Sequence, residues 1–407
     1  MMELFMLGTG GTYPLTTRAL ASAYVRVAGV GILIDCGEAT QIEMQKYGIG
    51  FNSTDYILIT HMHADHVSGM LGMMLAFKQA QRTKPVTIVG PVGIKKYVET
   101  FLMITSKFGY PVNFVELKKG DKNLNIRTGL KNDVVIKSVP AYHSRPCFAY
   151  SVDLERKPKF IREKVENLGI PVQYWKTLSQ GQDIVYQNKV YKGSDFISKP
   201  RKGLKISYVT DTRPMAHFRD FIKDSDIAVI EGMYRDIDKK DKAISEKHML
   251  WDESVSLARD NNIGEVILTH YSPSLQIEPN DAALLKSKLS NAILGRDGLY
   301  RHLKYEDEIV EPNTSVEKVE KPIQKSGKKD DTKKEDSNYR VQILKKYYKQ
   351  MAMLSAVEKV ERVTSFKYRV TLTGGVVQNA FVYKSVQSMK EDYKSMQQVD
   401  DFFVFVQ

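Results

Sequence analysis

The chain of 407 residues is 42% hydrophobic, which is enough to form two or three globular domains. It has no run of about 18 apolar residues, and its first residues lack the basic region and cleavage site of a secretory signal, so we expect no membrane association. The two cysteines, Cys36 and Cys147, form neither a zinc-finger spacing nor a disulfide framework. These features indicate a cytoplasmic protein.

The formal net charge of +12 is concentrated in two segments. Residues 154–205 carry 12 basic and 5 acidic side chains, residues 339–407 carry 11 and 6, and the rest of the chain is close to neutral. Lys and Arg drive binding to nucleic-acid phosphates, so a polyanionic partner is one interpretation. A solvated basic surface without a partner is the other.

The chain begins with predicted strands around a glycine-rich turn. Residues 8–11 resemble a phosphate-binding loop, but no Gly-Lys-Ser/Thr follows, so a tight turn near an active site is the better interpretation. Residues 24–27 and 31–34 alternate or run apolar, as sheet strands do. Asp35 follows them and either accepts a hydrogen bond from a metal-bound histidine or caps a helix over residues 39–47.

Residues 60–66, Thr-His-Met-His-Ala-Asp-His, directly follow an apolar strand over residues 56–59. The first two histidines are two residues apart, so in extended backbone they point to the same side. Asp65 and His66 fall on a tight turn, so this one loop can provide ligands to two neighbouring cations. Its nitrogen and oxygen donors are of the types that zinc binds. A solvated histidine-rich loop is the alternative. The candidate ligands are His61, His63, Asp65 and His66.

A site for two metal ions needs further ligands, since each zinc takes about three protein ligands and a water. Three more ligand-capable residues each stand at the carboxyl end of an apolar strand: His143 after residues 134–139, Asp211 after 206–210 and His270 after 266–269. Singly, each could be a hydrogen-bonded core histidine or a turn aspartate. Four strand ends that converge on one sheet edge are typical of an active site on a layered α/β scaffold.

Helices and strands alternate between these ligand segments. Residues 67–80 are predicted to be helical, with methionines at helical spacing that more often belong to a core than to a binding surface. Residues 85–90, 108–117 and 124–136 are predicted strands, with a helix up to Phe101 after the first of them. This order favours an αββα sandwich, in which two sheets pack face to face with helices outside.

Residues 154–205 interrupt the sandwich pattern as a basic arm. Glycines and a proline divide it into short pieces. Its Lys and Arg side chains can contact phosphates and its aromatic side chains can stack on bases. The candidates for such contacts with a nucleic acid are Lys157, Lys159, Arg162, Lys164, Tyr174, Trp175 and Lys176.

The last third of the chain contains a linker and a second module. Residues 312–338 are rich in charged residues and too poor in apolar ones to form a core, so we expect a flexible linker. Residues 339–407 are predicted to form a small α+β module of unknown role, without His or Cys and so without a metal site. We expect in it a helix to about Arg362, a hairpin around residues 373–375, a helix over 386–396 and a last strand over 402–406.

Taken together, the motifs resemble the metallo-β-lactamase fold superfamily and, within it, the ribonuclease Z group. The match occurs in the family's order and covers roughly residues 1–311. The segments that carry it are Leu7-Gly8-Thr9-Gly10-Gly11, Ile34-Asp35-Cys36-Gly37-Glu38-Ala39-Thr40-Gln41, residues 60–66, Tyr142-His143, Asp211-Thr212-Arg213-Pro214, His248 and Leu268-Thr269-His270-Tyr271-Ser272.

The resemblance implies an α/β (α+β) protein with a four-layer αββα metallo-β-lactamase sandwich over residues 1–311, in which 154–205 is an inserted arm that grips tRNA. It also implies a catalytic histidine at His248, with Glu231 as its carboxylate partner; from the sequence alone, His248 looks like a surface histidine. We expect two Zn²⁺ ions per subunit, or Mn²⁺. His61, His63 and His143 would hold one ion, Asp65, His66 and His270 the other, and Asp211 would bridge them.

The expected function is a zinc-dependent endoribonuclease that removes the 3′ trailer from precursor tRNA and leaves a 3′-hydroxyl. Metal-activated water would attack the phosphodiester, with Asp65 orienting or deprotonating the water and His248 protonating the leaving ribose oxygen. The resemblance further suggests a homodimer, in which one subunit's arm helps its partner. The alternatives are another phosphodiesterase of this fold, such as an exoribonuclease or cyclic-nucleotide phosphodiesterase, and a non-catalytic RNA-binding scaffold.

Overall fold

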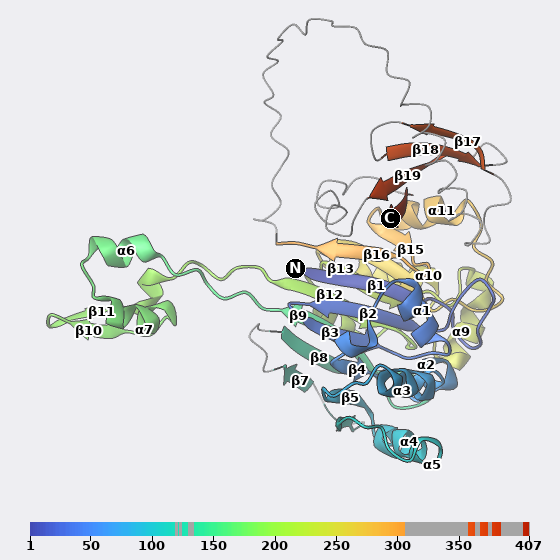
Figure 1. The fold of residues 1–407 in the computed structure, drawn as a ribbon, viewed down its shortest axis with the longest axis horizontal. Coiled ribbons are helices and arrows are strands. Elements are labelled where there is room, and N and C mark those ends of the chain that lie inside the picture. The colour runs from blue at the N-terminus through green and yellow to red at the C-terminus, as the bar shows by residue number, and fades with distance from the viewer. Residues whose placement is uncertain are drawn as a thin grey trace, which may run out of the picture. The chain divides into compact units, whose positions relative to one another are not determined.

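The fold of the protein is drawn in Figure 1 from a computed structural model. The structure describes residues 1–118, 121, 124–128 and 134–305, together with the backbone of four strands between residues 357 and 406. The chain divides into two compact units, residues 1–312 and 313–407. Within the described residues, no helix combines the length and apolar character needed to span a bilayer.

The first seven-stranded sheet has the strand order β16-β1-β2-β3-β4-β5-β6. Strands β1 to β3 run antiparallel, and β3 to β6 run parallel. All five residues of β3 are buried, as expected for a strand covered on both faces. The strands are β1 (Met2–Gly8), β2 (Ser22–Val27), β3 (Val30–Ile34), β4 (Tyr56–Leu58), β5 (Val86–Pro91), β6 (Val112–Leu117) and β16 (Tyr300–Leu303).

The second seven-stranded sheet has the order β15-β14-β13-β12-β9-β8-β7. Strands β12 to β15 run parallel to one another, while the pairs β7–β8, β8–β9 and β9–β12 are antiparallel. The strands are β7 (Leu124–Arg127), β8 (Val134–Ala141), β9 (Cys147–Leu154), β12 (Leu204–Val209), β13 (Ile227–Glu231), β14 (Glu265–Thr269) and β15 (Ala292–Leu294).

The strand predicted over residues 124–136 is wrong, because β7 and β8 divide this segment into two antiparallel strands. The sequence between them, Thr-Gly-Leu-Lys-Asn-Asp, contains the Gly, Asn and Asp residues that favour turns. Most of that turn lies outside the described residues. The valines after the turn continue the apolar pattern of the residues before it, so the sequence did not reveal the turn between the two strands.

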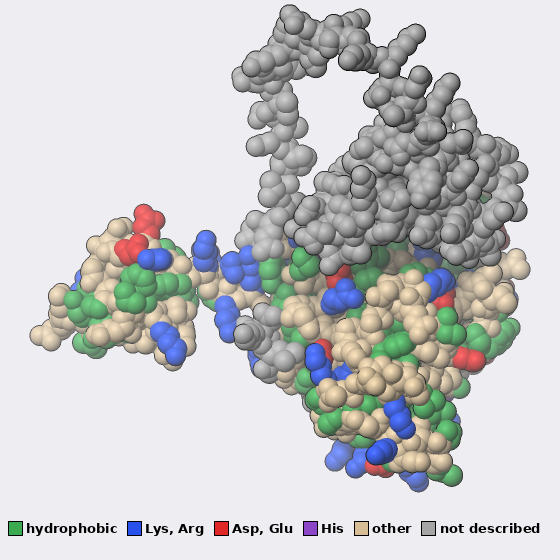
Figure 2. Space-filling view, viewed as in Figure 1, with side chains coloured by type: hydrophobic (Ala, Val, Ile, Leu, Met, Phe, Trp, Pro, Cys, Tyr) green, Lys and Arg blue, Asp and Glu red, His purple; other side chains and the backbone are tan. Residues whose placement is uncertain are grey.

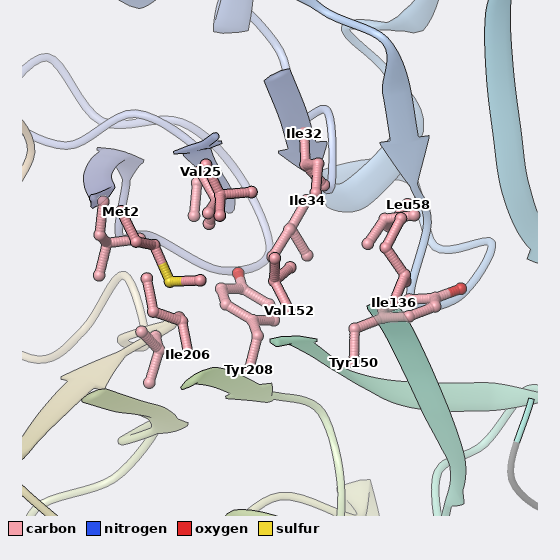
Figure 3. Packing of buried hydrophobic residues seen from close by; sticks show 14 of the residues in the cluster. Met2, Val25, Ile32, Ile34, Leu58, Ile136, Tyr150, Val152, Ile206 and Tyr208 are labelled. Carbon is pink, nitrogen blue, oxygen red and sulfur yellow. The ribbon is translucent and has the colours of Figure 1, made fainter. Parts of the chain in front are cut away.

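The main hydrophobic core lies between the two sheets, as Figure 3 shows. A hydrogen bond of 2.8 Å from the Tyr150 hydroxyl to the carbonyl of Ile59 ties the sheets together. The first sheet contributes Met2, Val25, Ile32, Ile34 and Leu58, and the second contributes Ile136, Tyr150, Val152, Ile206 and Tyr208.

Helices pack on the outer face of each sheet through their apolar sides. The predicted methionine face of residues 67–80 is buried in α3, where Met70, Met73 and Met74 belong to the core. These layers confirm the predicted αββα sandwich. The helices are α1 (Thr40–Lys46), α2 (Ala64–Val67), α3 (Met70–Gln79), α4 (Ile94–Thr100) and α5 (Leu102–Thr105), then α8 (His217–Ile222), α9 (Lys240–Glu246), α10 (Trp251–Ala258) and α11 (Asp281–Lys288).

The arm leaves the sandwich after β9 and returns at β12, whose end residues Leu154 and Leu204 pair directly. It has a small core of its own: Val165, Ile170, Leu178, Ile184 and Phe196. Lys and Arg side chains gather on the segments that join it to the sandwich (Figure 2). Its elements are α6 (Arg162–Asn167), α7 (Trp175–Ser179), β10 (Ile184–Tyr186) and β11 (Lys189–Tyr191).

The second unit contains a four-stranded sheet of order β17-β18-β19-β20: β17 (Val357–Arg362), β18 (Lys367–Leu372), β19 (Val377–Tyr383) and β20 (Phe402–Val406). The predicted hairpin strands and last strand are confirmed, with β18 and β19 antiparallel and β20 parallel to β19. The predicted helix up to Arg362 is wrong from Val357 onward, because these residues pair with β18. Val357 and Val360 are three residues apart, a spacing that suits a helix as well as a strand. Only the pairing with β18 shows that the segment is a strand. The earlier part of that helix and the helix over 386–396 lie outside the described residues.

Candidate metal centre

The structure brings together all seven side chains that the sequence predicted as metal ligands. Each follows a strand, where the carboxyl ends of β4, β8, β12 and β14 meet. They form two groups, in each of which the ligand atoms lie within 4.8 Å of one another. The first group is His61, His63, His143 and Asp211, and the second is Asp65, His66, Asp211 and His270.

Asp211 belongs to both groups and directs one carboxylate oxygen toward each. Its Oδ2 lies 3.6 Å from His61 Nε2 and 3.9 Å from His143 Nε2. Its Oδ1 lies 3.4 Å from His66 Nε2 and 3.3 Å from His270 Nε2. A carboxylate in this position can bridge two cations.

The spacing of the nitrogen atoms fits tetrahedral coordination. Ligand atoms that surround zinc at about 2.0–2.1 Å lie about 3.3 Å apart. In the first group, His63 Nδ1 lies 2.9 Å from His61 Nε2 and 3.1 Å from His143 Nε2. In the second, the Nε2 atoms of His66 and His270 are 3.1 Å apart. Without a cation, one nitrogen of each pair must donate a hydrogen bond to the other. A cation between them would take the place of that proton.

Contacts behind the ligands determine which ring nitrogen faces the centre. Asp35 Oδ2 lies 2.8 Å from His66 Nδ1, and the same carboxylate accepts a hydrogen bond from the backbone N–H of Thr60. The carbonyl of Lys247 lies 3.2 Å from His143 Nδ1. A proton held at Nδ1 leaves the Nε2 lone pair directed at the centre. Asp35 thus lies behind a ligand and does not cap α1, which begins without a side-chain hydrogen bond.

Burial and charge set the protonation states that a cation requires. Burial lowers the pKa of His61 well below its usual value, lowers that of His63, and lowers that of His143 to about 4. These imidazoles are therefore neutral at neutral pH. Burial would raise the pKa of Asp211, but the neighbouring imidazoles, His270 foremost, hold it well below its usual value. Neutral imidazoles and ionised carboxylates are the forms that bind divalent cations. His66 differs: burial would lower its pKa, but the carboxylates of Asp211, Asp35 and Asp65 raise it well above its usual value. A cation bound there would take the place of the proton on His66.

Four residues at the centre adopt a backbone conformation that residues other than glycine rarely adopt. Asp211 has a φ of 53° and His270 a φ of 59°, while Asp35 and Thr12 have φ values of 57° and 70°. Such left-handed residues gather at functional sites, where the surrounding contacts enforce them. The strained backbone at these four residues supports the interpretation of this centre as a functional site.

His248 is buried beside the two groups, which corrects the surface position expected from its local sequence. Its Nδ1 lies 2.9 Å from Glu231 Oε2, and its ring is stacked on that of His270 with the centroids 5.7 Å apart. Burial would lower the pKa of His248, but the carboxylate of Glu231 outweighs it and raises the pKa to about 9. Thr212 fixes Glu231 by donating its backbone N–H to Oε1.

Comparison with known proteins identifies the family. A family model described as anti-Pycsar protein Apyc1 matches residues 2–103. The ribonuclease Z of Clostridium kluyveri is 38% identical over 308 residues, which cover 75% of this chain and 100% of that protein. The chain belongs to the ribonuclease Z family. The ribonuclease Z of Clostridioides difficile is similar at 37% identity over 307 residues, with the same coverage.

Solved structures agree on the fold of this ribonuclease Z family member. The short form of human tRNase Z superposes with a TM-score of 0.53 at 19% identity, covering 74% of this chain and 99% of that one. The metallo-β-lactamase fold protein YhfI from Bacillus subtilis gives 0.52 at 17% identity, with 74% and 100% coverage. The fold is therefore that of the metallo-β-lactamases. The ribonuclease Z relatives, at 36–38% identity, show that the chain is a metal-dependent hydrolase.

The glycine-rich turn of this ribonuclease Z family member contacts the centre directly. The backbone N–H of Thr12 donates a hydrogen bond of 2.7 Å to Asp65 Oδ2. Gly11 lies so close to His270 that an added Cβ would be 2.6 Å from its ring. The sequence placed a tight turn near an active site, but it gave no signal that a backbone amide would hold a ligand carboxylate.

Asp297 holds this turn in place and was not singled out in the sequence. Its Oδ1 accepts hydrogen bonds from the backbone N–H and the hydroxyl of Thr9, at 2.9 and 2.8 Å. Its Oδ2 accepts one of 2.6 Å from the N–H of Ala19. A lone aspartate 288 residues from its partner carries no local pattern, so only the fold reveals it.

The predicted RNA-binding residues lie in the arm and belong to neither ligand group. Tyr174 and Trp175 are half-buried against the arm's own core, and the indole N–H of Trp175 donates to the carbonyl of Ile170. Their rings therefore have a structural role in the arm. The basic candidates Lys157, Lys159, Arg162, Lys164 and Lys176 are exposed.

Proposed function

We propose that this chain removes the 3′ trailer from tRNA precursors by hydrolysing one phosphodiester bond, and that it does so with two zinc ions per subunit. The relatives named ribonuclease Z and the fold of human tRNase Z support this substrate. The observation that carries the proposal is the pair of ligand groups joined by Asp211. Paired cations of this kind suit phosphodiester hydrolysis.

The donor atoms suit zinc, although manganese also accepts imidazole and carboxylate ligands. The assignment follows the two groups: His61, His63 and His143 would hold one ion, Asp65, His66 and His270 would hold the other, and Asp211 belongs to both groups and would be shared between them. Ions bound there supply positive charge beside the phosphate and lower the pKa of the attacking water.

Asp65 orients the attacking water. Burial would raise its pKa, but His66 and His270 hold the pKa far below the usual value, so the carboxylate stays ionised. The N–H of Thr12 fixes its Oδ2. The carboxylate is therefore held in one position, and it can accept a hydrogen bond from water.

His248 supplies the proton that the leaving ribose oxygen needs. Its pKa of about 9 keeps the ring protonated at neutral pH. Because Glu231 holds Nδ1, the proton to be transferred is the one at Nε2. Its transfer to the 3′-oxygen leaves a 3′-hydroxyl on the tRNA. Glu231 positions the ring of His248 and does not itself contact the reacting atoms.

The basic arm, residues 154–205, binds the tRNA body. Its surplus of exposed Lys and Arg favours contacts with the phosphate backbone. We assign residues 1–311 to the hydrolase domain, 312–338 to a linker and 339–407 to an accessory module. We further propose that the enzyme works in the cytoplasm as a homodimer in which one arm serves the partner subunit.

The test is the cleavage of a precursor tRNA transcript by the full chain, with and without a chelator, for the wild type and Asp65→Ala. We expect cleavage at the 3′ end of the mature tRNA by the wild type, and its loss on chelation and in the variant. Equal rates for the two proteins would overturn the mechanism.

The competing function is another phosphodiesterase of this fold, because the ligand groups alone suit any phosphodiester. Deleting residues 156–200 separates the two. If the deletion abolishes tRNA cleavage but leaves hydrolysis of bis(p-nitrophenyl) phosphate intact, tRNA is the substrate. Equal loss of both activities favours the competing function.

A further inference from the structure

Two tyrosines beside the metal centre have no role in the mechanism above. Tyr13 is 56% exposed and Tyr142 is 52% exposed. Among the aromatic side chains that the structure describes, these are the only Phe, Tyr or Trp residues with more than half of their surface exposed. Every other described Phe, Tyr and Trp is at least half-buried, so the position of this pair calls for an explanation.

Tyr13 lies beside the second ligand group. The loop that carries it is fixed on both sides of the centre: Gly11 contacts the His270 ring, and the N–H of Thr12 donates to Asp65. The N–H of Tyr13 itself donates to the carbonyl of Gly11 at 2.9 Å. The backbone of Tyr13 is therefore held next to the centre while its ring faces solvent.

Tyr142 lies beside the first ligand group, directly before His143. Its N–H donates to the Thr212 hydroxyl at 2.9 Å, and its carbonyl accepts from the N–H of Arg213. The ammonium group of Lys247 lies 5.0 Å from the centroid of its ring. The ring thus has a fixed backbone, a cation on one side and a large exposed surface.

Tyr13 directly follows the turn that contacts the second ligand group, and Tyr142 directly precedes a ligand of the first. A phosphodiester bound by cations in the two ligand groups would have one nucleoside on each side, so each tyrosine would be near one of them. Single-stranded RNA is bound by stacking of its bases on exposed aromatic rings, and stacking tolerates any base because each has a π-face. Lys247, whose ammonium group lies 5.0 Å from the centroid of the Tyr142 ring, would add positive charge for a nucleotide stacked there.

We propose that Tyr13 and Tyr142 are stacking sites for the two nucleobases joined by the scissile phosphate, one base on each ring. The inference rests on the proposed function, because it takes RNA as the substrate. It adds two specificity-determining residues to the metal centre, and they favour unpaired nucleotides on both sides of the cut.

The first test compares Tyr142→Ala, Tyr142→Leu and Tyr142→Phe in the full chain on a precursor tRNA transcript. Stacking of one base on an aromatic ring corresponds to a change of about 5- to 150-fold. We expect kcat/KM to fall by that factor in the Ala and Leu variants and to stay within about twofold in Phe. We expect the same three substitutions at Tyr13 to change kcat/KM as the corresponding Tyr142 variants do. Met103→Ala, which truncates a side chain 90% exposed on α5, is the matched control.

The second test removes the base instead of the ring. Precursor tRNAs with an abasic nucleotide on the 5′ or the 3′ side of the cut are cleaved by the wild type and each Ala variant. We expect each tyrosine to stack on the base of one side only. On the RNA that lacks this base, the Ala variant of that tyrosine should cleave at the same rate as the wild type.

Two results would overturn the inference: wild-type rates for both Ala variants, or an Ala variant that loses the same factor on every RNA. Bound zinc and the thermal midpoint are measured for each variant, and values equal to the wild type exclude damage to the centre. A wild type that cleaves no precursor tRNA would instead refute the proposed function.

Discussion

The tight packing of Gly11 against His270 makes Gly11→Ala a sharp test of the centre. An added Cβ at Gly11 would lie 2.6 Å from Cε1 and 2.8 Å from Nε2 of His270, whereas ordinary contacts are about 3.4–4 Å. The ring must therefore move by about 1 Å, and metal sites tolerate deviations of about 0.2 Å. We expect the ion of the second group to bind at least about tenfold more weakly and kcat to fall by about 100-fold.

The assay measures zinc content at fixed free zinc, together with cleavage of precursor tRNA. Gly11→Ala should retain the ion of the first group and lose the other, because the three atoms nearest to the added Cβ all belong to His270, a ligand of the second group. Gly50→Ala is the control, since Gly50 has a φ of −70° and no atom near its added Cβ. If Gly11→Ala holds two ions and cleaves like the wild type, the proposed placement of His270 at the second ion is refuted.

Three further predictions concern pH, stability and metal removal. Glu231 raises the pKa of His248 to about 9, so a proton donor there is active below that pKa and kcat falls as the pH rises through it. In Glu231→Gln this fall should move down toward pH about 6.5 or lower, and an unchanged alkaline limb in a pH–rate profile would argue against the assignment. Asp297→Ala should lower the free energy of unfolding by about 2–4 kcal/mol, measured by urea denaturation, because it leaves the donors of Thr9 and Ala19 unpaired; a change below about 0.5 kcal/mol would contradict it. Chelation should lower the thermal midpoint, since ions at 1,000 times their Kd stabilise the fold by about 4 kcal/mol each, and added zinc should restore it; a midpoint indifferent to chelator would mean that the ligand groups hold no ion.

Much of the sandwich and its ligand set could be predicted because both depend on local sequence. Apolar runs of four to six residues marked the strands, and a polar residue at the end of a run marked its carboxyl edge. His143 and Asp211 were found in this way, although nothing in the sequence states which strands are neighbours. The family resemblance supplied that arrangement, and the distances at Asp211 agree with it.

The features that the sequence missed depend on contacts between distant residues. Asp297 lies far along the chain from Thr9, and the left-handed backbone at Asp211 has no residue signature. The strand at Val357 reads as a helix until its pairing partner is known. Tyr174 and Trp175 were predicted to stack on RNA bases because the composition of the arm does not reveal that its aromatic side chains pack into a small core of their own.

The central claim is that seven side chains hold two ions through the shared carboxylate of Asp211. Metal analysis of the purified chain, dialysed against a low fixed zinc concentration, tests it directly. The account predicts two zinc ions per wild-type chain and fewer than one in Asp211→Ala, with loss of precursor-tRNA cleavage. A wild-type chain that retains no ion, or an Asp211→Ala chain that retains two and still cleaves, would contradict it.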